Sequence, residues 1–166
     1  MNFFSKLMLS ATIFVALPVA AADKERLVTS AKDVVGCYER INFSPALMSQ
    51  MNPVEPWKSP YQWFCFEPNG KFMWTGSSEY RQYTARELRN TLNKMPSPFH
   101  YQYIGNNTIR IGDDAGREVY DWISYFYTEN RTAPDGTKTD KGTLVMAVFD
   151  ADKGQAVYWR YLKKLK

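Results

Sequence analysis

The sequence predicts an all-β protein: an up-and-down antiparallel meander of about eight strands with one short helix after the third strand. Two observations predict it. Aromatic residues make up 16% of the chain and recur in alternating runs, and short turn signals rich in Gly, Asn and Asp separate those runs. Alternation of apolar and polar residues is typical of half-buried strands. Eight strands can close into a barrel, which removes the edges of the sheet.

The predicted strands follow one another with few residues between most of them. Asn69-Gly70 is a strong hairpin signal between the second and third strands, because both turn residues need positive φ. Gly-containing turns also join the fourth, fifth and sixth strands, and the seventh to the eighth. The eight ranges are Val34–Phe43, Tyr61–Glu67, Lys71–Gly76, Phe99–Ile104, Thr108–Gly112, Arg117–Thr128, Gly142–Asp150 and Gln155–Leu162.

One helix is predicted between the third and fourth strands, over Ala85–Met95. Thr84 and Glu87 match the capping box, in which each side chain bonds a backbone N–H at the start of a helix. The two longest connections, Ser44–Pro60 and Glu129–Lys141, contain no predicted helix or strand. Such loops are often lids or binding loops.

Residues 1–22 have the three parts of a secretory signal peptide: a short positive region, the apolar stretch Leu7–Val19, and a small-residue cleavage site ending at Ala22. The apolar stretch is shorter than the roughly 20 residues that span a bilayer. We therefore expect cleavage after Ala22, a single domain over residues 23–166, a periplasmic or secreted location, and no membrane-spanning segment after cleavage.

The charge pattern disfavours nucleic acid as a partner. The formal net charge is +4, and the basic residues are scattered apart from Lys163, Lys164 and Lys166 at the C-terminus. Proteins that bind nucleic acid usually concentrate basic residues on one face or stripe.

Cys37 and Cys65 are the only cysteines. If Tyr38 and Phe64 point inward, alternation places both cysteines on the outer face of neighbouring strands. An exported compartment permits disulfides, so we predict a structural Cys37–Cys65 bridge. A redox-active pair is disfavoured because no C-x-x-C pattern is present.

The sequence predicts no catalytic, metal or cofactor site. His100 is the only histidine, no nucleophile motif accompanies it, and we expect it to be structural. A zinc site would need three or four Cys and His ligands. Glu39 and Glu67 could form an outward carboxylate pair of the kind that glycosidases use, or be solvated strand charges. We expect no enzyme.

Three segments resemble the lipocalins and bacterial lipocalin-like domains. Val34–Arg40 resembles the first-strand G-x-W motif, with Tyr38 in place of the family's Trp, and Phe64–Gly76 resembles the second hairpin. Trp159–Tyr161 resembles the late segment whose Arg, here Arg160, closes the barrel floor. The resemblance implies a secreted, eight-stranded lipocalin-like (calycin-type) barrel that carries or senses a small apolar molecule.

The first functional hypothesis is therefore an exported protein that holds a small apolar or amphipathic molecule in an aromatic-lined barrel. Arg160 stacked on Tyr38 would close one end. Met48, Met51 and Trp57 are lid candidates; the M-x-x-M spacing of the two methionines also suits Cu(I), although apolar filling is favoured. The candidate lining residues are Tyr38, Phe64, Phe66, Phe72, Trp74, Tyr101 and Tyr103.

The alternative hypothesis is a periplasmic protein-binding module, such as an inhibitor of an enzyme or toxin. It would bind an envelope protein through the two long loops, which a rigid disulfide-braced barrel would hold in place.

Overall fold

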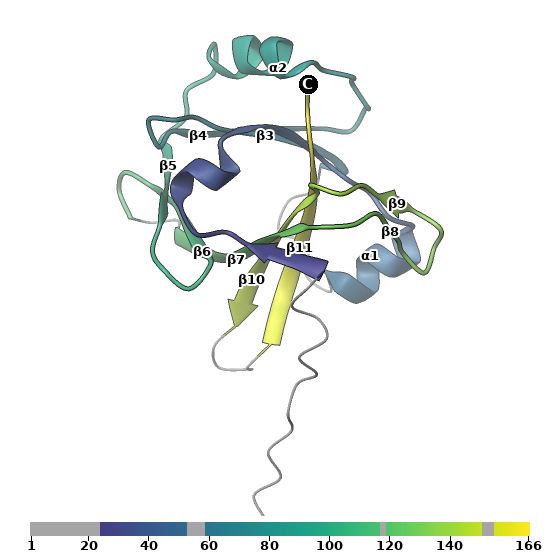
Figure 1. Cartoon of the computed structure of the whole chain (residues 1–166). Helices are drawn as coiled ribbons and strands as arrows, with labels where there is room; N and C mark the ends of the chain where they lie inside the picture. Colours follow the sequence, from purple (N-terminus) through teal and green to yellow (C-terminus); the bar gives the residue numbers. More distant parts are fainter. Residues whose placement is uncertain (1–23, 53–58, 117–118, 151–154) are drawn as a thin grey trace, which may run out of the picture.

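The computed structural model describes residues 24–52, 59–116, 119–150 and 155–166. The predicted signal segment and the lid candidate Trp57 lie outside these ranges. The eight strands of the barrel are β2 (Gly36–Arg40), β3 (Tyr61–Phe66), β4 (Phe72–Ser77), β5 (Phe99–Tyr103), β6 (Thr108–Asp113), β7 (Val119–Tyr127), β10 (Leu144–Asp150) and β11 (Gln155–Lys164) (Figure 1).

The strands form an antiparallel meander in the order β4-β3-β2-β11-β10-β7-β6-β5. The first barrel strand, β2, pairs with the last, β11, so the sheet curls back on itself. Between β4 and β5 the described chain has one isolated bridge, Lys71–His100, supported by the Tyr101 N–H donating to the Gly70 carbonyl at 2.7 Å. The predicted all-β meander is confirmed, as a barrel that is nearly closed with one seam at β4–β5.

The N-terminal part of the described chain closes one end of the barrel. A short strand, β1 (Glu25–Leu27), pairs with the end of β7, and a 3-10 helix, η2 (Ala31–Val34), follows. Val28 and Val34 are fully buried in the interior cluster. The Tyr38 hydroxyl donates to the Val34 carbonyl at 3.0 Å, so this buried hydroxyl has a hydrogen-bond partner.

The expectation that Ser44–Pro60 and Glu129–Lys141 lack structure was wrong. Helix α1 (Pro45–Met51) lies in the first loop, and the two-stranded hairpin of β8 (Arg131–Thr132) and β9 (Lys138–Thr139) lies in the second. Ser44 caps α1 by accepting from the Leu47 N–H at 3.3 Å. Proline suits the first position of a helix because its missing N–H would have no partner there, so Pro45 begins a helix in a segment that was predicted to be a loop.

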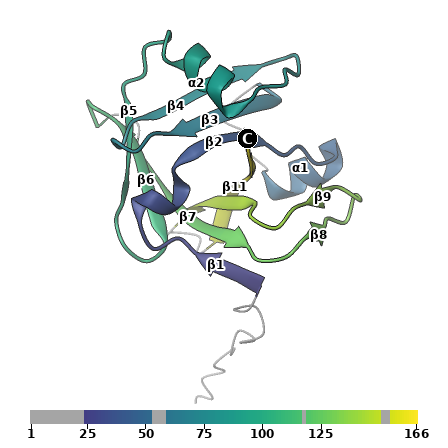
Figure 2. The ribbon, with the colours of Figure 1, turned by 45° about the horizontal axis from the view of Figure 1, so that its top comes forward.

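The predicted capping box is present, and helix α2 (Ala85–Leu92) packs outside the barrel over β3 and β4 (Figure 2). The Glu87 N–H donates to the Thr84 hydroxyl at 3.2 Å, and the Thr84 N–H donates to the Glu87 carboxylate at 2.8 Å. The helix ends three residues before the predicted Met95, which is exposed. Its continuation would therefore bury little apolar surface to offset the cost of ordering the chain.

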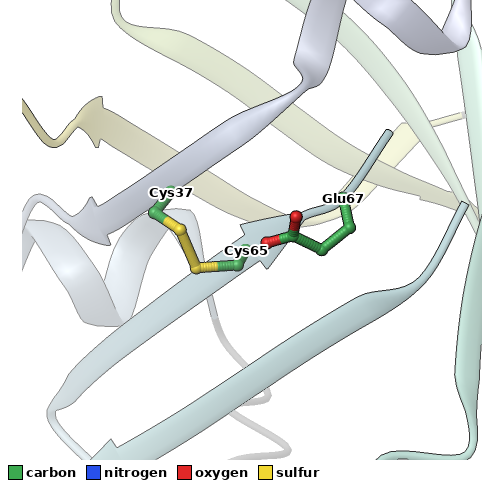
Figure 3. Close-up of side chains that lie close together, drawn as sticks. All are labelled: Cys37, Cys65 and Glu67. Atoms are coloured by element: carbon green, nitrogen blue, oxygen red, sulfur yellow. A yellow bond between two sulfur atoms is a disulfide. The ribbon is translucent and has the colours of Figure 1, made fainter. Parts of the chain in front are cut away.

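The disulfide predicted between Cys37 and Cys65 is confirmed. The two cysteines lie directly opposite each other on β2 and β3 and point outward, as strand alternation requires (Figure 3). Leu88 and Leu92 of α2 cover the bridge together with Trp63. The bridge is almost inaccessible to solvent, which suits a structural crosslink.

Reduction of this bridge should lower the free energy of unfolding by about 3 kcal/mol, because it releases a crosslink between residues 28 apart in the sequence. Urea denaturation with and without a thiol reductant measures the difference. The matched control is the double variant Cys37→Ala/Cys65→Ala, whose unfolding midpoint should not respond to the reductant. Equal midpoints for the oxidised and reduced native chain would contradict a stabilising role.

Candidate functional site

The barrel interior is largely filled by the residues that the sequence predicted as ligand lining. All seven belong to, or pack against, one interior cluster. A cavity lined by the described residues measures about 40 Å³ and lies beside the β4–β5 seam, where Phe72 and Trp74 face Phe99. That volume holds about three water molecules, whereas small-molecule sites measure about 300–1,000 Å³.

Arg160 lies inside the barrel but not on Tyr38, so the expected stacking partner was wrong. Its guanidinium lies between the rings of Phe64 and Trp122, 4.6 Å from each ring centroid. The side chain is 5% exposed and lines the interior cavity. The reason is the strand register: Tyr38 lies opposite Lys164, four residues beyond Arg160 on β11, and the Lys164 ammonium is the cation above the Tyr38 ring.

The two long loops, far apart in the sequence, meet on the outer side of the barrel. Helix α1 and the β8–β9 hairpin lie side by side in both views (Figures 1 and 2). The Ser44 N–H donates to the Asp135 carboxylate at the hairpin turn, 2.5 Å away. Between them lies a hollow of about 170 Å³, which we call the α1–hairpin groove. Its main lining residues are Phe43, Leu47, Met51, Tyr127, Arg131 and Tyr161.

Aromatic rings held by the barrel wall form the floor of this groove. Tyr161 meets the edge of the Phe43 ring at a centroid distance of 4.9 Å, and Tyr127 lies 6.2 Å away on its other side. The Arg131 guanidinium covers the Tyr127 ring at 3.9 Å and also pairs with Glu25. Burial, with the neighbouring Tyr127, raises the pKa of Tyr161 well above its usual value. The Tyr161 phenol is therefore neutral at physiological pH.

Asn52 fixes the end of α1 to the barrel. Its amide Nδ2 donates to the Trp159 carbonyl at 3.1 Å, and its Oδ1 accepts from the Trp159 N–H at 2.7 Å. Strand β2 pairs with only the last part of β11, from Leu162 to Lys164. The Asn52 side chain thus satisfies backbone groups of β11 where β2 does not reach, which explains why this polar residue is only 5% exposed.

The predicted lid residues are placed on the outside of the barrel as far as they are described. Met51 lines the α1–hairpin groove against Tyr161, which points outward because Arg160 and Leu162 point inward. Met48 lies on the same helix and is partly buried.

Glu39 and Glu67 do not form a carboxylate pair. Glu39 lies opposite Trp63, whereas Glu67 follows Phe66 at the far end of the same strand pair. The Glu67 carboxylate instead accepts from the Arg89 guanidinium at 2.6 Å. It also lies close to both cysteine sulfurs (Figure 3), but those sulfurs are joined to each other, so the group offers a metal only one ligand.

His100 is an exposed residue of β5. Its Nε2 lies 3.0 Å from the Asp114 carboxylate. Both side chains are exposed, so this contact is that of a surface pair.

Comparisons with protein-family models, with curated proteins and with solved structures found no match. In the described part of the chain, no helix has the length and apolar character needed to cross a membrane. Five residues that line the α1–hairpin groove or hold its walls in place were not among the predicted site residues: Asn52, Tyr127, Arg131, Asp135 and Tyr161.

Asn52→Ala should lower the free energy of unfolding by about 1–3 kcal/mol, because it leaves the Trp159 N–H and carbonyl without their partners. Urea denaturation checks the value. Asn93→Ala, at an exposed position after α2, is the matched control and should change stability by less than about 0.5 kcal/mol. An Asn52→Ala chain as stable as the Asn93→Ala chain would show that α1 is not held by this contact.

The link between the hairpin and α1 should be lost in acid. Backbone N–H groups of Ser44 and Thr137 donate to Asp135 and lower the pKa of its carboxyl. A lowered folded-state pKa means that the link is complete above about pH 4, the ordinary aspartate value, and is lost as the pH falls through the folded-state pKa.

A side-chain NMR titration of Asp135 should therefore give a pKa below the ordinary value. Asp135→Ala should accelerate hydrogen exchange of the Ser44 amide at neutral pH, whereas Asp114→Ala, at a distant surface pair, should not. An unchanged exchange rate of the Ser44 amide in Asp135→Ala would show that Asp135 does not hold the hairpin against α1.

Proposed function

We propose that this chain is an exported protein-binding module that recognises a partner protein through the α1–hairpin groove. The observation that carries the proposal is the convergence of the two longest connections on one hollow. Its lining of Phe, Met, Tyr and Arg contains the residue types that are enriched in the cores of protein interfaces.

The size of the groove supports a protein partner. At about 170 Å³ it is smaller than most small-molecule sites, and it has room for one or two protruding side chains. Binding energy in protein interfaces is concentrated in a few side chains that fill such pockets, with Tyr and Arg over-represented among them. Tyr161 and Arg131 supply these residue types here.

The groove is also held in place before any partner binds. Tyr127 and Tyr161 belong to long barrel strands, Asn52 fixes α1 to β11, and Asp135 joins the hairpin to Ser44. Binding to a preformed surface costs less conformational entropy than binding to loops that must first be ordered.

Filling the groove tests the proposal. Ala133→Trp places a large ring at the hairpin wall of the groove, and Ala46→Trp, at an exposed position of α1 outside the groove, is the matched control. We expect affinity purification from the exported fraction of the host to recover a stoichiometric partner with the native chain and with Ala46→Trp. The affinity measured with that partner should fall about tenfold or more in Ala133→Trp. Equal affinity of the two variants, or no stoichiometric partner for the native chain, would overturn the proposal.

A second proposal, supported by the lipocalin-like resemblance, is that the barrel holds a small amphipathic molecule with an anionic group. The observation that favours it is the Arg160 guanidinium beside the aromatic cavity at the β4–β5 seam. Occupation would require the ring of Trp74 or Phe99 to move, because the cavity has only about 40 Å³.

Native mass spectrometry of the chain purified from its host distinguishes the two proposals. Retention of a small molecule that is lost on denaturation supports the interior site. A mass equal to that of the polypeptide alone, in a chain that still binds its partner, argues against it.

Export is part of both proposals, and the buried Cys37–Cys65 bridge supports it because disulfides persist in oxidising compartments. N-terminal sequencing of the chain from the host envelope or medium should begin at Asp23. An N-terminus at Met1 in a chain that remains in the reducing cytoplasm would contradict export.

A further inference from the structure

We propose that a second hollow, on the other side of the β8–β9 hairpin, binds a neutral saccharide. This hollow measures about 280 Å³ and lies between the end of β2, the start of β3, the chain after β4, and β9. The residues that the argument uses are Glu39, Asn42, Tyr80, Lys138, Asp140 and Lys163. We call it the Tyr80 hollow. Its volume is close to the lower bound of about 300 Å³ for small-molecule sites.

The polar groups of the hollow include both signs of charge. Glu39 and Asp140 contribute carboxylates, and Lys138 and Lys163 contribute ammonium groups, whereas Arg40, which also borders the hollow, has its guanidinium over the Tyr158 ring. The two carboxylates offset the two ammonium groups, so neither a small anion nor a small cation meets a site of a single opposite charge. A sugar hydroxyl both donates and accepts hydrogen bonds, so a saccharide can use carboxylate acceptors and ammonium donors together. Asn42 adds an amide that can donate and accept in the same plane.

Tyr80 supplies an aromatic wall. Its side chain is 56% exposed, yet its ring is positioned by Tyr61, 5.5 Å away, and by Trp63, 6.4 Å away. The Tyr80 hydroxyl donates to Glu39 at 3.4 Å. Burial and the nearby Glu39 charge raise the pKa of Tyr80.

A single exposed tyrosine is ordinary on a protein surface, but here the ring borders a polar hollow. The negative face of an aromatic ring attracts weakly positive hydrogens, and one face of a pyranose presents such C–H groups while its rim carries hydroxyls. The combination of one ring with a mixed set of donors and acceptors therefore fits a sugar better than a peptide side chain of either charge.

The hollow is built on the barrel and is separate from the α1–hairpin groove. Glu39 lies directly between Lys163 of β11 and Trp63 of β3 in the register of the sheet. Thr139 of β9 lines the groove, whereas its chain neighbours Lys138, also of β9, and Asp140, directly after the strand, line the hollow. Successive strand residues point to opposite faces, so β9 is the wall between two independent sites.

Titration of the native chain, followed by two-dimensional amide NMR and calorimetry, tests the proposal. The probes are tetrasaccharides of glucose, mannose, galactose and N-acetylglucosamine, with inorganic phosphate and spermidine as ionic probes. We expect at least one tetrasaccharide to shift the amides of Glu39, Asn42 and Asp140. The two ionic probes should leave them unchanged.

Variants sharpen the test. Tyr80→Ala should weaken saccharide binding about tenfold, Tyr80→Phe should retain it because the ring remains, and the distant Lys94→Ala should bind as the native chain does. Ala133→Trp, which fills the groove, should also leave saccharide binding unchanged, so this result is independent of the proposed partner. The proposal is overturned if no tetrasaccharide shifts these amides, if phosphate or spermidine shifts them instead, or if Tyr80→Ala binds like the native chain.

Discussion

The pairing of β2 with β11 is the constraint on which the rest of the structure depends. It joins the first barrel strand to the last through three residue pairs, from Leu162–Arg40 to Lys164–Tyr38. Because β4 and β5 share only one isolated bridge, the strands would without it fall into two sheets, β4-β3-β2 and β11-β10-β7-β6-β5, with more exposed edges. Because β2 covers only the last part of β11, the strands are staggered, and backbone groups of β11 remain to be satisfied. Asn52 satisfies those at Trp159. The stagger therefore determines where α1 docks, and through α1 it determines where the groove lies.

Most of the barrel could be predicted from the sequence because its signals are local. Alternating aromatics and Asn-Gly or Gly-containing turns act over a few residues, and all eight predicted strands are present. The disulfide could also be predicted from local alternation. If the side chains of Tyr38 and Phe64 point inward, those of their neighbours Cys37 and Cys65 must point outward. Helix α1 was missed although Ser44 and Pro45 form a good helix start. Four prolines within Ser44–Pro60 are typical of a loop, and they favoured that prediction.

The candidate sites were harder to predict because they depend on register and on contacts between distant segments. Alternation showed that Arg160 points inward, but its ring partners follow from the offset between β2 and β11, which no local pattern encodes. The same holds for Ser44 and Asp135, which are 91 residues apart and meet only after the barrel has closed. Aromatic alternation likewise identifies interior residues without showing whether their side chains fill the space between them. Here the cavity beside the β4–β5 seam measures only about 40 Å³.

The residues that stabilise this barrel are distinct from those that line its outer hollows. The interior cluster and the outer cluster under α2 bury the large apolar side chains, so substitutions at the exposed hairpin need not disturb either. Strand β9 then serves two surfaces, because alternate residues face the α1–hairpin groove and the Tyr80 hollow. Its position depends on the Asp135 contact with Ser44 and on the stacking of Arg131 over Tyr127. A change that shifts the hairpin as a body would therefore alter both surfaces together, whereas a side-chain change on one face of β9 would alter only one.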